Sequence, residues 1–222
     1  MQASTKEMTI KAIILDFDGV IVESEEIKNR AFRDLFSDYP EHLDEIMAYH
    51  LGHKAVSRYD KFEYIVTRIL GQAYSEERAR EIDARFSPLL RQRIIECPYV
   101  EGAEAFLEYF SSRLPLYVAS ATPQNELEAI IAGRRIGGYF KGIYGTPLEK
   151  EAIIREIVAG EKLMAQEAAY IGDTRADCEV ARKVGAVFVG RMGADVFRGL
   201  SVPAFRDLHG VRGHLQGMIG DL

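Results

Sequence analysis

The chain has 222 residues, of which 47% are hydrophobic and 28% are charged, and its formal net charge is −6. This length and composition predict one large globular domain, or a core domain that carries an insertion. The acidic balance argues against a nucleic-acid-binding surface, and the apolar runs are far shorter than a membrane span. We therefore expect a small-molecule partner, and neither a nucleic acid nor a membrane.

Compartment and assembly are only weakly constrained by the sequence. Residues 1–9 are polar and lack the apolar stretch of a secretory signal. Cys97 and Cys178 have no CxxC neighbour and form no disulfide framework. These features favour the reducing cytoplasm, and they leave open whether the protein is a monomer or a dimer.

A short apolar run near the N-terminus ends in two carboxylates. Residues 12–15 read as a strand buried on both faces. Asp16 and Asp18 follow, separated by Phe17, which we expect to point into the core, and Gly19 then permits a tight turn. Two carboxylates this close resist ionising together, and a divalent cation such as Mg²⁺ removes that cost. The alternative is an ordinary polar turn after a strand.

The next segment predicts helices and no strand. From residue 25 to residue 95 the apolar positions recur at helical spacing. We interpret this block as a separate helical domain, residues 23–97, inserted into a core domain of residues 1–22 and 98–222. Its two linkers are expected near residues 22–24 and 96–100.

Beyond Pro98, helices and strands alternate. This order predicts an α/β fold with a doubly wound, mostly parallel sheet, whose strand carboxyl ends share one edge. In the tail, residues 190–222, we expect only a last strand and a surface helix. The expected strands are residues 116–120, 142–144, 168–171 and 186–189, with a marginal one at 204–206.

Polar residues gather just beyond these strands. Carboxylates, hydroxyls, an ammonium and a helix N-terminus suit a divalent metal beside a phosphate. Each has a simpler interpretation, which for Thr122 we favour and take as the prediction: Thr122 as a helix N-cap, Lys150 as a surface lysine, Asp177 as a first-turn acid. Their placement at one edge favours the functional interpretation. The residues are Asp16, Asp18, Ser120, Ala121, Thr122, Lys150, Asp173 and Asp177.

These motifs resemble those of the haloacid dehalogenase superfamily. The resemblance is carried by residues 16–20 (DFDGV), Ser120, Lys150 and residues 172–177 (GDTRAD), in that order. The helical insertion is similar to the first cap type of that superfamily, found in relatives of phosphoglycolate phosphatase and β-phosphoglucomutase. The resemblance implies a Rossmann-like core with an all-helical cap that sets substrate specificity.

The resemblance also implies roles for individual residues. Asp16 would be the nucleophile, and Asp18 the general acid and then the general base. Mg²⁺ would be held by Asp16, the main-chain carbonyl of Asp18 and Asp173, with Asp177 and Thr174 in support. Ser120, the Ala121 amide and Lys150 would bind the phosphoryl group. In the family a proline commonly follows this lysine, and none follows Lys150. Lys141 is therefore kept as a weaker alternative for the same role.

For the cap, the resemblance suggests substrate contacts. Residues 56–58 (VSR) are similar to a segment that contacts substrate in sugar-phosphate members, so Arg58 either holds a second anionic group or is a surface residue. His53 is a further candidate, although a loop histidine is usually only solvated. Glu23, Glu26 and Lys28 lie where the linker is expected to pass the site.

The leading functional hypothesis is a Mg²⁺-dependent phosphatase acting on a small phosphorylated metabolite, a sugar or organic-acid monophosphate. A phosphomutase is the main alternative, although the Gly-Asp-x-x-x-Asp motif is typical of phosphatases. Asp18 disfavours dehalogenation. A phosphonate hydrolase would need a cap lysine such as Lys28 or Lys54. A non-catalytic binding module is disfavoured by the intact aspartates and Lys150.

Overall fold

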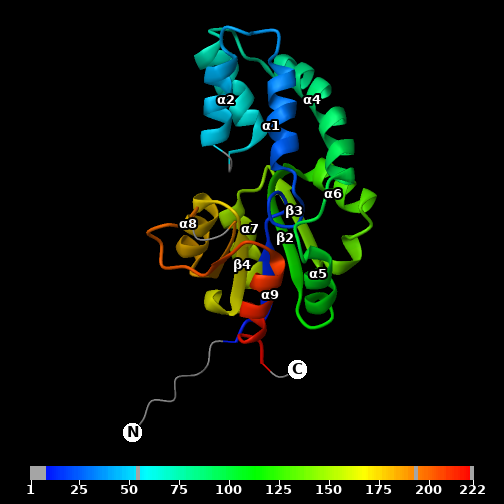
Figure 1. The fold of residues 1–222 in the computed structure, drawn as a ribbon, viewed down its shortest axis with the longest axis vertical. Helices are drawn as coiled ribbons and strands as arrows, with labels where there is room; N and C mark the ends of the chain where they lie inside the picture. Colours follow the sequence, from blue (N-terminus) through cyan, green and yellow to red (C-terminus); the bar gives the residue numbers. More distant parts are fainter. Residues whose placement is uncertain (1–8, 54–55, 193–194, 221–222) are drawn as a thin grey trace.

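A helical block stands on an α/β block, as Figure 1 shows. The computed structural model describes residues 9–53, 56–192 and 195–220. Within these residues, no helix has both the length and the apolar character needed to cross a bilayer.

The lower block is built on a parallel sheet with the strand order β3-β2-β1-β4-β5-β6. This confirms the predicted doubly wound α/β fold, including the marginal last strand. β1 lies between β2 and β4, which explains why its four residues are fully buried and apolar. The strands are β1 (Ala12–Leu15), β2 (Leu116–Pro123), β3 (Gly142–Thr146), β4 (Ala168–Gly172), β5 (Val187–Arg191) and β6 (Ala204–Phe205).

Alternate residues of β1 serve the two faces of the sheet. Ile13 and Leu15 pack into a core shared with α5, α6 and α9, whereas Ala12 and Ile14 pack against α7 and α8. α9, which was expected to be a surface helix, buries three apolar residues and so completes the first face. These helices are α5 (Ala103–Ser111), α6 (Gln124–Gly133), α7 (Lys150–Gly160), α8 (Arg175–Val184) and α9 (Leu208–Gln216), with short 3₁₀ turns η2 (Gly137–Tyr139) and η3 (Ala165–Glu167).

The upper block is the helical insertion, here called the cap. No strand occurs in the described part of residues 25–96, as predicted. Phe32, Phe62 and Phe86 pack together at its centre, with ring centroids 5.1–5.7 Å apart. Its elements are α1 (Glu25–Leu35), α2 (Leu43–Gly52), α3 (Arg58–Tyr64), the π-helical turn η1 (Ile65–Ile69) and α4 (Glu76–Glu96).

Two adjacent chain crossings join the cap to the core. The amide of Glu23 donates to the carbonyl of Pro98 at 2.9 Å, and the amide of Val100 donates to the carbonyl of Ile21 at 3.0 Å. The two predicted linkers therefore run side by side and support each other, next to Asp18 and the end of β1.

Arg134, at the end of α6, contacts the C-terminal end of the cap helix α4. Its Nη1 donates to the carbonyls of Ile94, Ile95 and Cys97 at 2.7, 2.8 and 2.9 Å, and its guanidinium lies 4.0 Å from the centroid of the Tyr99 ring. Carbonyls at a helix C-terminus have no partner within the helix. A cation from the core therefore stabilises the last turn of α4 at the junction between the two blocks.

We expect Arg134→Met to lower the free energy of unfolding by about 2 kcal/mol, because carbonyls that accept from a charged donor lose their partner. Arg135→Met is the matched control, since Arg135 is exposed and surface changes usually stay within about 0.5 kcal/mol. Urea unfolding curves of both variants test this. Equal effects of the two substitutions would contradict a stabilising role for the contacts of Arg134 with the end of α4.

Candidate active site

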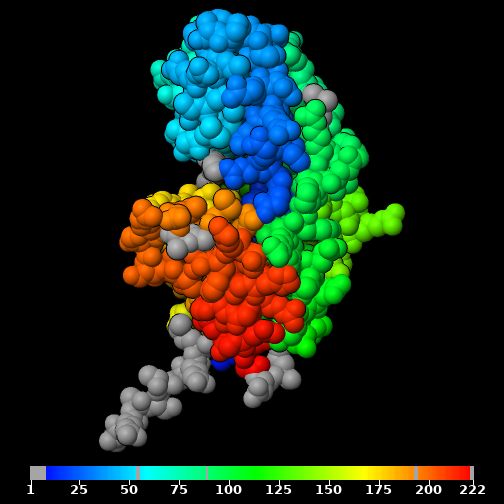
Figure 2. All heavy atoms as spheres, viewed as in Figure 1, coloured from blue at the N-terminus to red at the C-terminus, as the bar shows by residue number. Residues whose placement is uncertain are grey.

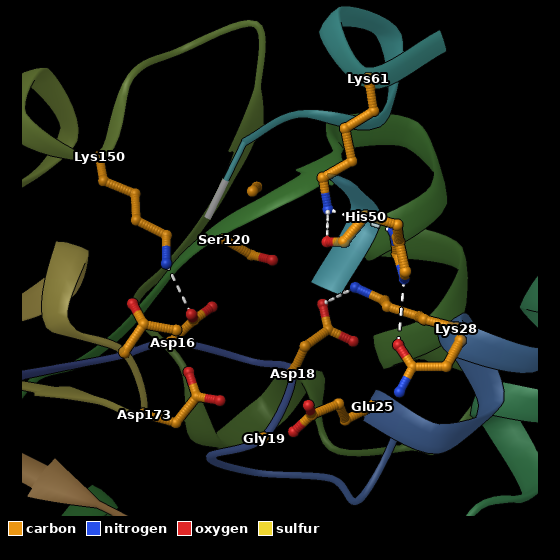
Figure 3. A pocket seen from close by; sticks show the side chains of 13 residues that line it. Asp16, Asp18, Gly19, Glu25, Lys28, His50, Lys61, Ser120, Lys150 and Asp173 are labelled. Atoms are coloured by element: carbon orange, nitrogen blue, oxygen red, sulfur yellow. Dashed lines mark hydrogen bonds and ion pairs between the residues drawn. The ribbon is translucent and has the colours of Figure 1, made fainter. Parts of the chain in front are cut away.

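Carboxylates and a serine from three neighbouring strands meet at one edge of the sheet. Asp16 directly follows β1, Ser120 lies in β2, and Asp173 directly follows β4. All three line a cavity between the core and the cap (Figure 3). Its lining residues are Asp16, Asp18, Gly19, Glu25, Lys28, Asn29, His50, Lys61, Ser120, Ala121, Lys150, Asp173 and Thr174.

Lys150 bridges two of the aspartates. As the first residue of α7 it places its Nζ 2.6 Å from Asp16 Oδ2 and 2.7 Å from Asp177 Oδ1. Burial alone would lower the pKa of Lys150, but these carboxylates raise it well above its ordinary value, so the ammonium stays charged. The rival Lys141 is instead exposed and pairs with Glu161. Of the two lysines, only Lys150 lies in the cavity.

The carboxylates of this group suit a cation. Oxygen atoms of Asp16, Asp173 and Asp177 lie within 4.8 Å of one another. Burial, opposed by Lys150, raises the pKa of Asp16 to about 6. Burial, followed by repulsion from Asp16 and Asp177, raises the pKa of Asp173 well above its ordinary value. A divalent cation would relieve this repulsion, and carboxylate oxygens are the ligands that Mg²⁺ prefers. The donor set therefore fits the expected metal.

Gly19 makes room for Asp173. Its φ is +73°, and a Cβ atom at this position would lie 2.3 Å from Asp173 Oδ2. The glycine after the two aspartates is thus needed both for the left-handed turn and for the close approach of a carboxylate from another strand.

We expect Gly19→Ala to weaken Mg²⁺ binding by about 10- to 100-fold, because the new methyl group displaces Asp173. Gly71→Ala is the matched control: its φ is +63°, so the backbone strain is similar, but nothing lies within 4 Å of an added Cβ. The Mg²⁺ concentration that gives half of the maximal rise in Tm is the measurement. An equal change in both variants would contradict a role for the Asp173 contact.

Asp18 is held by three donors. It accepts hydrogen bonds from Ser24 Oγ at 2.5 Å and Thr122 Oγ1 at 2.9 Å, and Lys28 Nζ lies 2.5 Å from its Oδ2. Burial alone would raise the pKa of Asp18, but Lys28, Ser24 and Thr122 together hold it below the ordinary value. Lys28 belongs to the cap helix α1, so a side chain of the cap contacts a carboxylate of the core.

A phosphonate hydrolase would use a cap lysine such as Lys28 as its reactive amine, whereas in this structure Lys28 is paired with Asp18. Lys54, the other candidate, lies outside the described residues.

The prediction that Thr122 caps the following helix is wrong. β2 continues to Pro123, which occupies the N-cap position of α6 without a side-chain cap, and Thr122 instead donates to Asp18. The strand is longer because Pro123 pairs with Thr146 of β3. The pairing register of β2 against β3 shifts between Ala119 and Pro123, a feature that depends on the neighbouring strand and that sequence reasoning missed.

Asp177 and Thr174 support the site at the start of α8. Thr174 is the N-cap of α8, where its Oγ1 accepts from the Asp177 amide and Asp177 Oδ2 accepts from the Thr174 amide. The other oxygen of Asp177 accepts from Lys150 and from Tyr170 Oη, both at 2.7 Å. Asp177 therefore fixes Lys150 and the start of α8 at the same time.

A family model for haloacid dehalogenase-like hydrolases matches residues 13–190. The chain belongs to this family. A comparison with curated proteins found no match.

Solved structures of this hydrolase family share the fold. β-Phosphoglucomutase from Clostridium difficile has a TM-score of 0.74 at 18% identity, over 94% of this chain and 96% of its own. A predicted phosphoglycolate phosphatase from Haemophilus somnus has a TM-score of 0.73 at 14% identity, over 92% and 97%. The HAD hydrolase YfnB from Bacillus subtilis, bound to magnesium, has a TM-score of 0.72 at 14% identity, over 94% and 99%.

The three cap-side residues expected to contact substrate do not line the main cavity of this haloacid dehalogenase-like hydrolase. Arg58 is buried, with Nη2 2.6 Å from Glu126 Oε1 and Nη1 3.2 Å from Asp83 Oδ1. Glu23 pairs with Arg191. His53 is exposed, and its Nδ1 lies 2.8 Å from the carbonyl of Tyr49. Arg58 and Glu23 are thus held by partners inside the protein.

Other residues of the cap line the main cavity. Glu25, Lys28 and Asn29 belong to α1, His50 to α2 and Lys61 to α3, and all line the cavity. Figure 3 shows Lys61 and His50 across the cavity from Asp16 and Asp173. Glu25, Lys28 and Asn29 share one helix face by their i, i+3 and i+4 spacing. That spacing was a usable signal for them, but no comparable local pattern predicted the meeting of His50 and Lys61.

Proposed function

We propose that this protein is a Mg²⁺-dependent phosphatase that hydrolyses a small phosphorylated metabolite through an aspartyl-phosphate intermediate. The observation that carries the proposal is the buried group in which Lys150 bridges Asp16 and Asp177 while Asp173 faces the same cavity. Such a group combines a carboxylate nucleophile, a fixed cation and a set of oxygen ligands.

In the proposed reaction Asp16 attacks phosphorus, and the leaving oxygen departs with a proton from Asp18. Water, deprotonated by Asp18, then releases phosphate from Asp16. The main-chain amide of Phe17 donates to Asp16 Oδ1 at 2.6 Å and Lys150 holds Oδ2, so the nucleophile has a fixed orientation. Because Asp18 must carry a proton in the first step, its ion pair with Lys28 is expected to open when substrate enters.

Phosphoryl binding falls to Ser120, the amide of Ala121 and Lys150, which line the cavity around Asp16. Asp16, the main-chain carbonyl of Asp18 and Asp173 would hold Mg²⁺. When bound, the cation would neutralise negative charge on the carboxylates and on the phosphoryl oxygens. Asp177 and Thr174 keep Lys150 and the start of α8 in position.

Phosphate release from a panel of sugar phosphates, phosphorylated acids, nucleotides and phosphonates, with Mg²⁺ or with EDTA, tests the function. We expect release from one metabolite class, abolished by EDTA. Isomerisation of a sugar phosphate with little release would favour a phosphomutase instead. No turnover by folded protein on any substrate would reject catalysis and leave a binding module.

Mg²⁺ is expected to stabilise the protein more at pH 7.5 than at pH 5. Asp16 has its folded pKa raised above the ordinary 3.8, to about 6, and Asp173 has its pKa raised as well. In the metal-free protein the stability linked to these groups is therefore present at low pH and is lost as the pH rises through the folded pKa values. Mg²⁺ binds the deprotonated carboxylates and so restores stability above about pH 6.

At a Mg²⁺ concentration of about 100 times Kd, linkage gives a gain of about 2.7 kcal/mol in the free energy of unfolding. For a chain of this length that raises Tm by roughly 5 to 10 °C at pH 7.5, and by much less at pH 5. Thermal unfolding with Mg²⁺, with EDTA and with NaCl at matched ionic strength measures the difference. Equal shifts at the two pH values would contradict binding at these carboxylates.

A further inference from the structure

Arg191 is a buried arginine at the end of β5, with only 7% of the residue exposed. Its backbone is held on both sides, because Gly190 pairs with Gly172 of β4 and with Ala204 of β6, and Arg191 itself pairs with Phe205. The carboxyl ends of parallel strands share one edge of the sheet. The short strand β6 therefore keeps Arg191 at the edge that carries the candidate active site.

The guanidinium of Arg191 reaches the turn that follows β1. Its Nη1 donates to the carbonyl of Gly19 at 2.8 Å and lies 3.3 Å from Glu23 Oε2, while Nη2 pairs with Glu23 Oε1. The planar fork thus binds both oxygens of one carboxylate and a main-chain carbonyl. In Figure 2 the tail that contains β6, in orange and red, lies directly below the dark blue start of the cap. One side chain therefore joins the tail to both ends of residues 19–23, the segment that leads into the cap.

Asp18 and Ser24 lie just outside the two ends of this segment. Ser24 Oγ donates to Asp18 Oδ1 at 2.5 Å, and the amide of Gly19 donates to the carbonyl of Val22 at 2.9 Å. The segment is thus a closed turn, with the hydrogen bond between Asp18 and Ser24 across its base. Because Arg191 holds the residue after Asp18 and the residue before Ser24, its contacts fix the position of both partners.

The arginine, rather than the glutamate, makes this arrangement favourable. The side chain of Glu23 is 43% exposed and water would satisfy it, whereas the side chain of Arg191 is 8% exposed. A buried guanidinium is costly until it is paired. The buried charge therefore favours the one arrangement of residues 19–23 in which Gly19 and Glu23 both face it.

We propose that Arg191 is a positioning residue, which acts through Gly19 and Glu23 to hold Asp18 where the leaving oxygen takes its proton. Arg191 does not line the main cavity, so it acts only through these residues. The proposal rests on the proposed function, because it gives Asp18 the role of general acid. It also gives β6 and the end of β5 a part in the reaction.

Two esters of similar shape test the proposal. Phenyl phosphate has a basic leaving oxygen that gains from a proton, whereas the nitrophenolate of p-nitrophenyl phosphate leaves readily without one. We expect Arg191→Met to lower kcat/KM for phenyl phosphate about 10- to 100-fold, because general acid catalysis contributes at least that much, and to lower the value for p-nitrophenyl phosphate by less than about threefold. Asp18→Asn should show the same dependence on the leaving group, more strongly. Arg191→Lys should restore part of the loss, because an ammonium pairs with Glu23 but does not form the fork.

Arg198→Met is the charge-matched control, since Arg198 lies in the same tail but is exposed and pairs with Asp195. It should change kcat/KM for neither ester. Assays run below the Tm of each variant compare folded proteins. Equal losses for the two esters in folded Arg191→Met, or no loss for phenyl phosphate, would overturn the proposal.

Amide hydrogen exchange, measured by peptide mass spectrometry without substrate, separates this proposal from the proposed function. We expect peptides that cover residues 17–24 to exchange about 10-fold faster in Arg191→Met than in the wild type, because the segment opens locally, and to be unchanged in Arg198→Met. If exchange follows this pattern but the wild type hydrolyses no phosphate ester, the phosphatase proposal fails and the placement of Asp18 by Arg191 stands. Unchanged exchange in Arg191→Met would overturn the placement, whatever the wild type hydrolyses.

Discussion

Replacing Asp16 with asparagine is expected to reduce phosphate release at least about a thousandfold, the scale on which removal of a nucleophile acts. An amide does not attack phosphorus, and it also removes one oxygen ligand from the group formed with Asp173 and Asp177. Phosphate release with the preferred substrate, at saturating Mg²⁺, is the measurement.

The same substitution should leave the fold intact. Asparagine has the shape of aspartate, and Lys150 keeps its partner Asp177 at 2.7 Å. Burial makes the charge on Asp16 unfavourable, as its pKa of about 6 indicates, so its removal costs little in the absence of metal. Tm in EDTA checks this. A folded Asp16→Asn protein that retains a tenth or more of the wild-type rate would exclude Asp16 as the nucleophile.

Lys150→Met is expected to lower kcat/KM by about 10²- to 10³-fold, because a fixed cation beside the transferring phosphoryl group is lost. Two buried carboxylates also lose their partner, at 2.6 and 2.7 Å, and breaking a buried pair typically costs about 3–5 kcal/mol. The loss of Lys150 further raises the pKa of Asp16, so the acid limb of the pH–rate profile should move to higher pH.

Lys141→Met is the control for Lys150→Met. Both substitutions remove one lysine charge, but Lys141 is exposed and its pair with Glu161 lies outside the cavity, so a change of about 0–1 kcal/mol in stability is expected. Assays run below the Tm of each variant compare folded proteins. A folded Lys150→Met enzyme with wild-type kcat/KM and an unmoved pH profile would contradict the assigned role.

Much of the core could be predicted because its signals are local. The four residues of β1 are apolar without alternation, since both faces of the central strand are covered, and the carboxylates follow it directly. The chemistry-bearing residues of the core lie near the carboxyl end of a strand, just after a strand or at the start of a helix, so parallel order alone brings them to one edge.

The incorrect predictions concern residues whose environment is set by contacts with residues distant in sequence. β2 extends to Pro123 because Pro123 pairs with Thr146 of β3. Thr122 therefore lies within the strand and donates to Asp18 instead of capping α6. Arg58 was expected either to hold an anionic group or to lie at the surface, and its burial was not predicted, because α4 brings Asp83 and α6 brings Glu126 beside it. Neither partner is close to residue 58 in sequence, and no local pattern encodes their meeting.

Locating the phosphoryl group on the chain would test the central claim most directly. Wild type and Asp18→Asn are mixed with the preferred substrate and Mg²⁺, quenched in acid at short times, and mapped by peptide mass spectrometry. We predict a hydroxylamine-labile phosphoryl adduct on Asp16 in the wild type, and slower appearance and slower decay of this adduct in Asp18→Asn, which lacks both the general acid for its formation and the general base for its hydrolysis. Phosphate release without an adduct on Asp16 in either protein would contradict the proposed reaction.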